Sequence, residues 1–289
     1  MRLLVTGAGG MLGHDVLRAG ERAGHELVPV DLPEVDITDA GAVAELLERL
    51  GSLDAVINCA AWTDVDGAES RQDLAHAVNV TGAGNLADAS AAARVPLVHV
   101  STDYVFDGVA PLDEAGDARA YVESDPTGPR SVYGATKLAG ERLVLAASRR
   151  NAVARTAWLF GVDGANFVET MLRLAGERDH VDVVVDQIGS PTWSGHLAPA
   201  LIGLIERQVS GISHLTGGGR ASWYEFAREI FRQADVDCEV RDATSEQMAR
   251  PAPRPAWSVL ESERGDVLPL PPWQDGLAGY LAARAGVTR

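Results

Sequence analysis

A tyrosine and a lysine lie four residues apart in the stretch SVYGATKLAGE, residues 131–141. The residues that follow are rich in Ala and Leu and include Lys and Glu, which predicts a helix around Ala135–Arg150. Because positions i and i+4 share a helix face, the phenol of Tyr133 and the ammonium of Lys137 are expected to be neighbours. A phenol with a reference pKa of about 10 is a proton donor of modest strength, and a nearby ammonium lowers that pKa. The pair therefore suits proton transfer to a carbonyl oxygen, although the same spacing also occurs on solvated helix surfaces.

A glycine-rich turn connects the first predicted strand to the first predicted helix in LLVTGAGGMLGHDVL, residues 3–17. Glycines allow the backbone to approach a pyrophosphate closely, and a helix N-terminus offers free N–H groups and a partial positive charge. The spacing fits GxxGxxG completely and GxGxxG incompletely, since position 12 is leucine. We therefore predict a dinucleotide-binding turn that contains Gly7, Gly10, Met11, Leu12 and Gly13.

An aspartate at the end of the second predicted strand bears on the choice of cofactor. The carboxylate of Asp31 can accept a hydrogen bond from a ribose 2′-hydroxyl and would repel a 2′-phosphate. No Arg or Lys follows it closely, so NADH is preferred and NADPH remains possible. Asp36 and Ile37 are predicted to lie near the adenine edge, with a solvated loop acid as the equal alternative for Asp36.

Short β-branched runs alternate with longer Ala- and Leu-rich stretches through the first half of the chain, which indicates βαβ units and a parallel sheet covered on both faces. The predicted strands are Leu3–Thr6, Leu27–Val30, Ala55–Asn58, Leu97–Ser101 and Val153–Thr156. The predicted helices between them lie around Leu12–Ala23, Ala40–Leu50, Asp73–Ala93 and Ala135–Arg150.

The alternation becomes irregular after about residue 160. Helices are predicted at Phe167–Arg178, at Ser222–Asp235 and at the end of the chain, with a proline-rich stretch at Arg250–Trp257. We therefore expect an α/β protein with a Rossmann-like, doubly wound parallel sheet. Residues 1–158 would form the dinucleotide-binding domain, to which later segments return, and residues 159–289 a smaller α+β lobe for the substrate.

Composition narrows the classes of partner. The 289 residues are 46% hydrophobic and carry a formal charge of −16, which argues against nucleic acids and anionic membranes as partners. An anionic ligand would need a locally positive pocket. The two cysteines form no disulfide framework, and no signal peptide or transmembrane stretch is evident, so a cytoplasmic location is expected.

Four motifs in order resemble the extended short-chain dehydrogenase/reductase superfamily: TGxxGxxG, NxAA, a Ser-Thr pair at a strand end, and YxxxK. The carboxyl ends of parallel strands line the ligand crevice, so Ala60, Ala61 and Thr102 are expected to face the cofactor. The resemblance implies that Tyr133 protonates the substrate oxygen and Thr102 orients it. Lys137 would hold the nicotinamide ribose, and Asn79 would be structural.

Further segments, including RTAWLFG, STDYVFDG and VDQIGSPT, resemble the dTDP-4-dehydrorhamnose reductases over nearly the whole chain. That resemblance implies reduction of the C4 keto group of a dTDP-4-keto-6-deoxyhexose by a reduced nicotinamide. The residues that it places at the substrate are Thr63, Val65, Asp66, Thr102, Asp103, Tyr133, Trp158, Asn166 and Arg254. Trp158 would pack against the sugar, Asn166 would cap a helix near the diphosphate, and Arg254 would bind a phosphate.

Three positions distinguish the chain from its superfamily or leave details open. Tyr104 follows Asp103 where nucleotide-sugar dehydratases have Glu, and Trp158 stands where 4-epimerases have Asn. Ser131 replaces the family's Asn before VYG.

Two alternatives to a dTDP-4-dehydrorhamnose reductase remain open. They are a related deoxysugar reductase of secondary metabolism and a non-catalytic NAD(P)-binding regulatory subunit. Monomer and homodimer both remain open, as does Mg²⁺, for which no carboxylate cluster is evident and no ligand is predicted.

Overall fold

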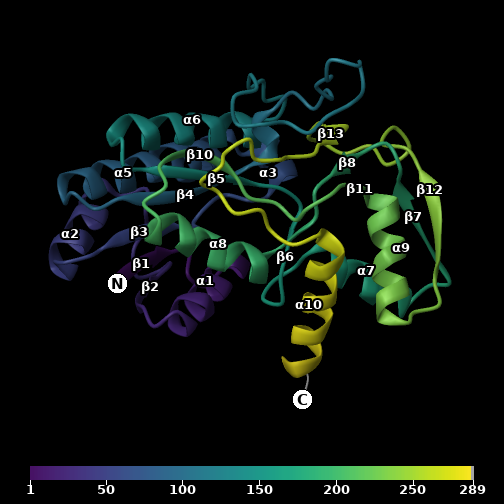
Figure 1. The fold of residues 1–289 in the computed structure, drawn as a ribbon, viewed down its shortest axis with the longest axis horizontal. Coiled ribbons are helices and arrows are strands. Elements are labelled where there is room, and N and C mark those ends of the chain that lie inside the picture. The colour runs from purple at the N-terminus through teal and green to yellow at the C-terminus, as the bar shows by residue number, and fades with distance from the viewer. Residues whose placement is uncertain (288–289) are drawn as a thin grey trace.

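A parallel six-stranded sheet forms the centre of the first lobe (Figure 1). The computed structural model describes residues 1–287. In spatial order the strands are β10 (Gly211–His214), β5 (Ala152–Thr156), β4 (Leu97–Thr102), β3 (Ala55–Asn58), β1 (Arg2–Thr6) and β2 (Glu26–Val30). Every neighbouring pair in this sheet runs parallel. The predicted Rossmann-like α/β class is confirmed.

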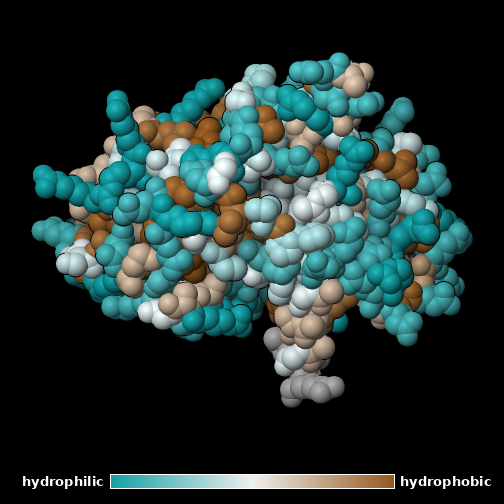
Figure 2. Space-filling view, in the orientation of Figure 1, coloured by the Kyte–Doolittle hydropathy of each residue, from teal (hydrophilic) through white to brown (hydrophobic). Residues whose placement is uncertain are grey.

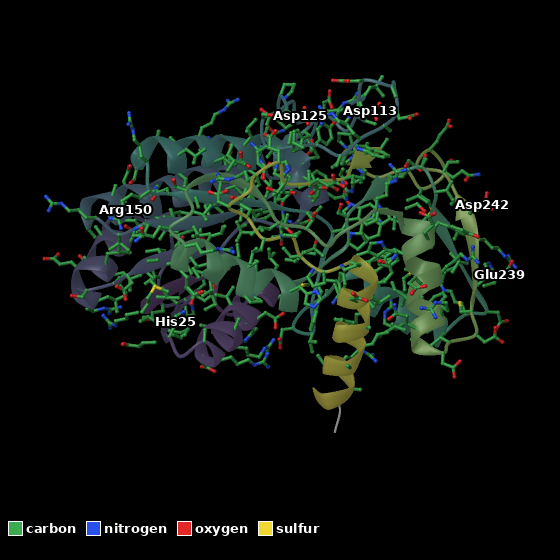
Figure 3. All side chains as sticks on the ribbon, viewed as in Figure 1. His25, Asp113, Asp125, Arg150, Glu239 and Asp242 are labelled. Atoms are coloured by element: carbon green, nitrogen blue, oxygen red, sulfur yellow. The ribbon has the colours of Figure 1, made fainter. Side chains whose placement is uncertain are left out.

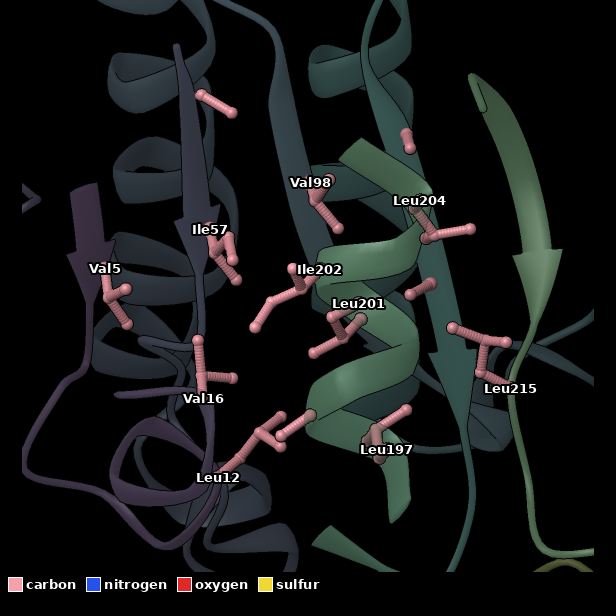
Figure 4. Packing of buried hydrophobic residues seen from close by; sticks show 14 of the residues in the cluster. Val5, Leu12, Val16, Ile57, Val98, Leu197, Leu201, Ile202, Leu204 and Leu215 are labelled. Carbon is pink, nitrogen blue, oxygen red and sulfur yellow. The ribbon is translucent and has the colours of Figure 1, made fainter. Parts of the chain in front are cut away.

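Helices cover both faces of the sheet. One face packs against α1 (Met11–Arg22) and α8 (Ser194–Glu206), and the other against α2 (Ala40–Leu50), α5 (Ala83–Ala92) and α6 (Val132–Ala147). Figure 4 shows how the first of these layers is filled, by branched side chains from the strands and the two helices. The residues labelled there are Val5, Leu12, Val16, Ile57, Val98, Leu197, Leu201, Ile202, Leu204 and Leu215. Burial of both faces explains the continuous apolar runs of the strands.

The order of the strands creates a crevice at one edge of the sheet. From β1 the chain continues to β2 on one side, and then crosses to β3 on the other side of β1. In open α/β sheets, ligands bind outside the carboxyl ends of the strands at such a switch point. The segments after β1 and β3, which contain the glycine turn and Ala60–Ala61, are therefore placed together by topology.

The second lobe packs three helices around an aromatic core. These are α7 (Phe167–Ala175), α9 (Trp223–Ala234) and α10 (Trp273–Val287). The parallel pair of β7 (His180–Val184) and β12 (Glu239–Ala243) flanks α9 at the far end of the molecule (Figure 1). Short strands complete the lobe: β6 (Leu159–Phe160), β8 (Ile188–Gly189), β9 (Thr192–Trp193), β11 (Ala221–Ser222) and β13 (Trp257–Ser258).

Two elements from the second half of the chain return to the first lobe. Helix α8 packs on α1, and β10 extends the sheet beside β5. A return of later segments to this domain is predicted from the sequence, but neither α8 nor β10 is among the predicted elements. The apolar sequence of α8, with Pro199 inside the helix, gave no amphipathic pattern that would have distinguished it from a buried strand.

Two predicted helices differ in detail. The predicted helix Asp73–Ala93 is divided into α4 (Gln72–His76), a π-helical turn (Ala77–Gly82) and α5. The predicted helix Ala135–Arg150 begins earlier, at Val132, because the Ser131 side chain caps it by accepting from the Gly134 N–H. Tyr133 and Lys137 therefore both lie within α6, as the i, i+4 argument requires.

Hydrophilic residues predominate on the face shown in Figure 2, and hydrophobic residues are scattered over it. Charged side chains labelled in Figure 3, such as Arg150, Glu239 and Asp242, lie at the periphery. Within residues 1–287, every helix is too short or too polar to cross a lipid bilayer.

Candidate active site

The glycine turn has the backbone geometry of a phosphate cradle. Gly7 has φ +70°, and a Cβ there would lie 2.5 Å from the Ala60 backbone nitrogen. A Cβ on Gly13 would lie 2.2 Å from the Gly7 carbonyl oxygen, and α1 begins after Gly10 without a side-chain cap. Since this helix N-terminus is not capped by a side chain, it can offer N–H groups at Met11 and Leu12 to a diphosphate. The turn therefore fits a dinucleotide.

Asp31 lies directly beside this turn. Its carboxylate accepts from the Gly9 N–H and the Leu32 N–H, both at 2.8 Å, which holds it against the turn where a ribose would bind. Asp36 is exposed and accepts from the backbone and hydroxyl of Thr38, so its visible contacts are those of a local loop acid. Ile37 is buried in the core, where a Cβ on Gly82 would contact it.

The proposed catalytic side chains meet where α6 packs on β4. Thr102 ends β4 and is 6% exposed, and its hydroxyl donates to Asp103 at 2.8 Å. Lys137 is 2% exposed, and its ammonium nitrogen lies 2.7 Å from the Val100 carbonyl oxygen of β4. Half-buried Tyr133 lies one turn earlier on α6 and hydrogen-bonds Thr102.

The electrostatics of Tyr133 differ from the sequence-based expectation. We expected Lys137 to lower the pKa of the phenol. Desolvation instead raises the pKa of Tyr133 to about 12, against a smaller lowering by its hydrogen bond to Thr102 and a further increase from Asp103. Lys137 is not among the groups that shift this pKa, and its ammonium nitrogen is directed toward the Val100 carbonyl of β4. This raised pKa keeps Tyr133 protonated at neutral pH, the form that a proton donor needs.

Two buried polar residues support this arrangement. Burial raises the pKa of Asp103 to about 6, while hydrogen bonds to Thr102 and Ser258 oppose the shift. Asn79, on the π-helical turn, bonds both the N–H and the carbonyl of Trp62 and also the Thr136 hydroxyl. Its contacts agree with the structural role predicted for it, and π-helical turns often occur near functional sites.

A cavity of about 870 Å³ adjoins this site and extends into the second lobe. Tyr104 connects the two, because its ring lies 5.4 Å from that of Tyr133 and also lines the cavity. The cavity wall combines apolar side chains with four arginines. The apolar residues include Phe167, Met171, Leu174, Val181, Val183 and Trp223, and the arginines are Arg130, Arg178, Arg250 and Arg254. Two carboxylates, Asp182 and Glu246, also line the cavity, so the arginines outnumber the acids in its wall although the protein has a net charge of −16, as an anionic ligand requires.

Arg254 and Asp66, both predicted to contact substrate, are brought together by the fold. Their side chains form an ion pair of 2.8 Å, and Asp66 also accepts from the Ala252 N–H. This pairing lowers the pKa of Asp66, against a desolvation penalty. The carboxylate partly neutralises Arg254, so Arg130 and Arg178 are further phosphate ligands to consider. No spacing in the sequence singled out these two arginines.

Trp158 occupies a constrained position between the lobes. Its φ of +47° is unusual for a residue with a side chain, and such strain often occurs at functional sites. The indole stacks on Trp223 with ring centroids 3.6 Å apart and donates to the Ser258 hydroxyl. Because Trp223 lines the cavity, Trp158 lies one ring away from its wall.

Replacing Trp158 with Ala should raise the KM for the sugar substrate much more than the KM for the cofactor, because the indole is predicted to pack on the sugar. Steady-state kinetics with each reactant varied in turn measures both constants. Trp193→Ala provides a control, since Trp193 is a half-buried indole packed on α10. Unchanged sugar kinetics in Trp158→Ala, with only a loss of ~3–5 kcal/mol in stability, would make Trp158 a packing residue.

The remaining predicted substrate residues have defined positions. Asn166 caps α7, as predicted, by accepting from the Glu169 N–H at 3.0 Å, and α7 lines the cavity through Thr170 and Met171. Val65 begins α3 (Val65–Ser70) and is half-buried, while Thr63 is exposed just before it.

Among residues 1–287, no cluster of three or more His, Cys, Asp or Glu side chains could hold a metal ion.

A parallel doubly wound sheet, a glycine turn that fits a dinucleotide, and half-buried Tyr133 beside buried Thr102 and Lys137 are the features of an extended short-chain dehydrogenase/reductase. The family model described as the RmlD substrate binding domain matches residues 1–285. The chain belongs to the dTDP-4-dehydrorhamnose reductase family.

Individual relatives agree with this assignment. The dTDP-4-dehydrorhamnose reductase of Mycobacterium tuberculosis is 46% identical, over 99% of this chain and 94% of its own. The crystal structure of the Bacillus anthracis dTDP-4-dehydrorhamnose reductase in complex with NADP is 36% identical, with a TM-score of 0.92 over 98% of this chain and 99% of its own. A probable dTDP-4,6-dihydroxy-2-methyloxan-3-one 4-ketoreductase of Streptomyces antibioticus is 42% identical over 96% of this chain and 93% of its own.

Proposed function

We propose that the protein reduces the C4 keto group of a dTDP-4-keto-6-deoxyhexose, with dTDP-4-dehydrorhamnose as the substrate and dTDP-rhamnose as the product. The observation that carries the proposal is the half-buried Tyr133 phenol beside Thr102, connected through Tyr104 to a cavity of about 870 Å³ with four arginines in its wall. An intact Thr-Tyr-Lys set favours an enzyme over a regulatory subunit. A related deoxysugar ketoreductase remains the alternative, because one such relative is 42% identical.

The roles of the side chains follow from their positions. A reduced nicotinamide, when bound, supplies a hydride to the carbonyl carbon. Tyr133 then donates its phenolic proton to the carbonyl oxygen, and Thr102 orients that oxygen through its hydroxyl. Lys137, held at the Val100 carbonyl, would contact the nicotinamide ribose. The aromatic pair of Trp158 and Trp223 would exclude water from the sugar side of the site.

The two halves of the chain divide these tasks. We assign the cofactor to residues 1–158, through the glycine turn, Asp31 and Ala60–Ala61. The substrate is assigned mainly to residues 159–289, through α7 and Arg254, although Thr63, Val65, Asp66 and Trp158 come from the first half. Anionic phosphates would lie among the cavity arginines, with Asp66 limiting the net charge at Arg254. Neither Mg²⁺ nor a particular oligomeric state is required by this assignment.

We expect NADH to be preferred over NADPH, because the Asp31 carboxylate beside Gly9 would repel a 2′-phosphate. In Asp31→Ala, the ratio of kcat/KM with NADH to kcat/KM with NADPH should fall toward one. The ratio is the informative quantity, since Asp31 also holds the turn. Asp36→Ala is the control: it removes a nearby exposed carboxylate and should leave the ratio unchanged. NADPH used as well as NADH by the unmodified protein would refute this preference.

The test of the overall function is NADH oxidation with a small panel of dTDP- and UDP-linked 4-keto sugars, with products identified by NMR. We expect turnover of dTDP-4-dehydrorhamnose to exceed that of the other sugars. Faster turnover of a different dTDP-4-keto sugar would favour the deoxysugar alternative. Cofactor binding without turnover of any sugar would favour the regulatory subunit.

A further inference from the structure

A chain of buried hydrogen bonds leads from the cofactor turn to Lys137 through His99. Asn58 and His99 are each 1% exposed and lie at paired positions on β3 and β4. The Asn58 amide nitrogen lies 2.9 Å from His99 Nδ1, and His99 Nε2 lies 3.3 Å from Lys137 Nζ. The proposed reaction assigns no task to His99.

The backbone determines the direction of these hydrogen bonds. The Asn58 side-chain oxygen accepts from the Ala60 N–H at 2.9 Å and from the Thr6 hydroxyl at 2.8 Å. A backbone N–H can only donate, so the Asn58 oxygen must face Ala60 and its NH₂ group must face His99. His99 Nδ1 must therefore accept, which places the proton of the neutral imidazole on Nε2.

That proton is directed at Lys137. If Lys137 carried an ammonium, two hydrogen-bond donors would face each other, because an ammonium has no lone pair to accept from the His99 Nε2–H. A neutral amine can accept from Nε2–H and still donate to the Val100 carbonyl. A protonated imidazole does not resolve this conflict, because burial beside Lys137 holds the pKa of His99 well below its usual range.

We propose that His99 is a positioning residue that disfavours the ammonium form of Lys137 through an Nε2–H imposed by Asn58. The inference deepens the proposed reductase chemistry and rests on it. It gives His99 a part in setting how readily the lysine beside the catalytic tyrosine loses its ammonium proton.

The other groups around Lys137 agree with this assignment. Burial lowers the pKa of Lys137 to about 8, while Glu141 on its own helix opposes the shift, as Cys59 after β3 does where its thiol is ionised. Glu141 is already paired with Arg155 at 2.8 Å, which reduces its attraction for Lys137. Desolvation raises the pKa of Cys59 to about 12, so its thiol is neutral and offers no counter-charge at neutral pH. Tyr133, one turn away, is also neutral.

The composition of the chain makes a direct measurement practical. Of the 25 Lys and Arg residues, Lys137 is the only lysine. Protein labelled with ¹³C-lysine therefore gives one side-chain Cε signal, whose titration reports the pKa of Lys137 without cofactor or substrate. His99→Gln can present an amide oxygen to Nζ and should raise that pKa by about one unit or more. His99→Asn keeps a partner for Asn58 and removes the group facing Lys137. It should raise the pKa of Lys137 less than His99→Gln does.

Thr6→Val is the matched control. It removes one hydrogen bond to Asn58, but the Ala60 N–H still fixes the amide, so the pKa of Lys137 should not change. ¹⁵N NMR of the unmodified protein provides a second test, with the His99 signals assigned by their loss in His99→Asn. It should show the proton on Nε2. A proton on Nδ1, or an unchanged lysine pKa in His99→Gln, would overturn the proposal. Because neither experiment needs turnover, failure of the proposal for His99 is distinguishable from failure of the reductase assignment.

Discussion

Replacing Tyr133 with Phe should reduce the rate of sugar reduction by roughly 10²–10⁴-fold, the usual contribution of a positioned acid. The substitution keeps the ring that packs at 5.4 Å against Tyr104 and removes only the hydroxyl. Affinity for NADH should therefore change little. Single-turnover kinetics together with cofactor binding by fluorescence would measure both quantities on the same protein.

Lys137→Ala gives the necessary comparison. Lys137 would serve both the cofactor ribose and the tyrosine, so its loss should weaken NADH binding as well as the rate. The double variant should be less impaired than the product of the two single effects predicts, because the residues act in one proton-transfer unit. Near-normal turnover by Tyr133→Phe would make the four-residue spacing incidental to catalysis.

The largest effect on stability should come from breaking the buried ion pair between Arg155 on β5 and Glu141 on α6. Both side chains are 2% exposed, and the guanidinium lies 2.8 Å from the carboxylate. Ser101 also donates to Glu141. Glu141→Leu would leave the Arg155 cation buried without its partner, and should lower the free energy of unfolding by about 3–5 kcal/mol. Urea unfolding followed by circular dichroism measures the change.

A double variant separates the ion pair from simple packing. In Glu141→Leu with Arg155→Met both charges are absent, so no uncompensated ion remains in the core and much of the stability should return. A loss of stability in the double variant as large as the sum of the two single losses would show that the charges do not act as a pair.

Local sequence patterns were sufficient for the sheet and the cofactor turn. The β-branched runs matched five strands of the sheet because a parallel sheet buries both faces, and the glycine spacing matched a turn in which Gly7 and Gly13 tolerate no Cβ. The YxxxK spacing likewise corresponds to one face of α6.

Features that depend on distant contacts could not be predicted in this way. The pairing of Asp66 with Arg254 joins residues 188 positions apart, and the stacking of Trp158 on Trp223 depends on how the lobes meet. The reversed pKa shift of Tyr133 arises from desolvation, which the identity of its neighbours in sequence does not report. The role of His99 likewise follows only from the bonds of Asn58.

In the proposed reaction, hydride reaches C4 of the hexose while Tyr133 supplies the proton to the oxygen. The most direct measurement uses NADH deuterated at the transferred position, dTDP-4-dehydrorhamnose as the acceptor, and NMR of the product. We expect one deuterium at C4 and none elsewhere on the sugar. Deuterium at another carbon, or cofactor oxidation without deuterium in the sugar, would contradict it.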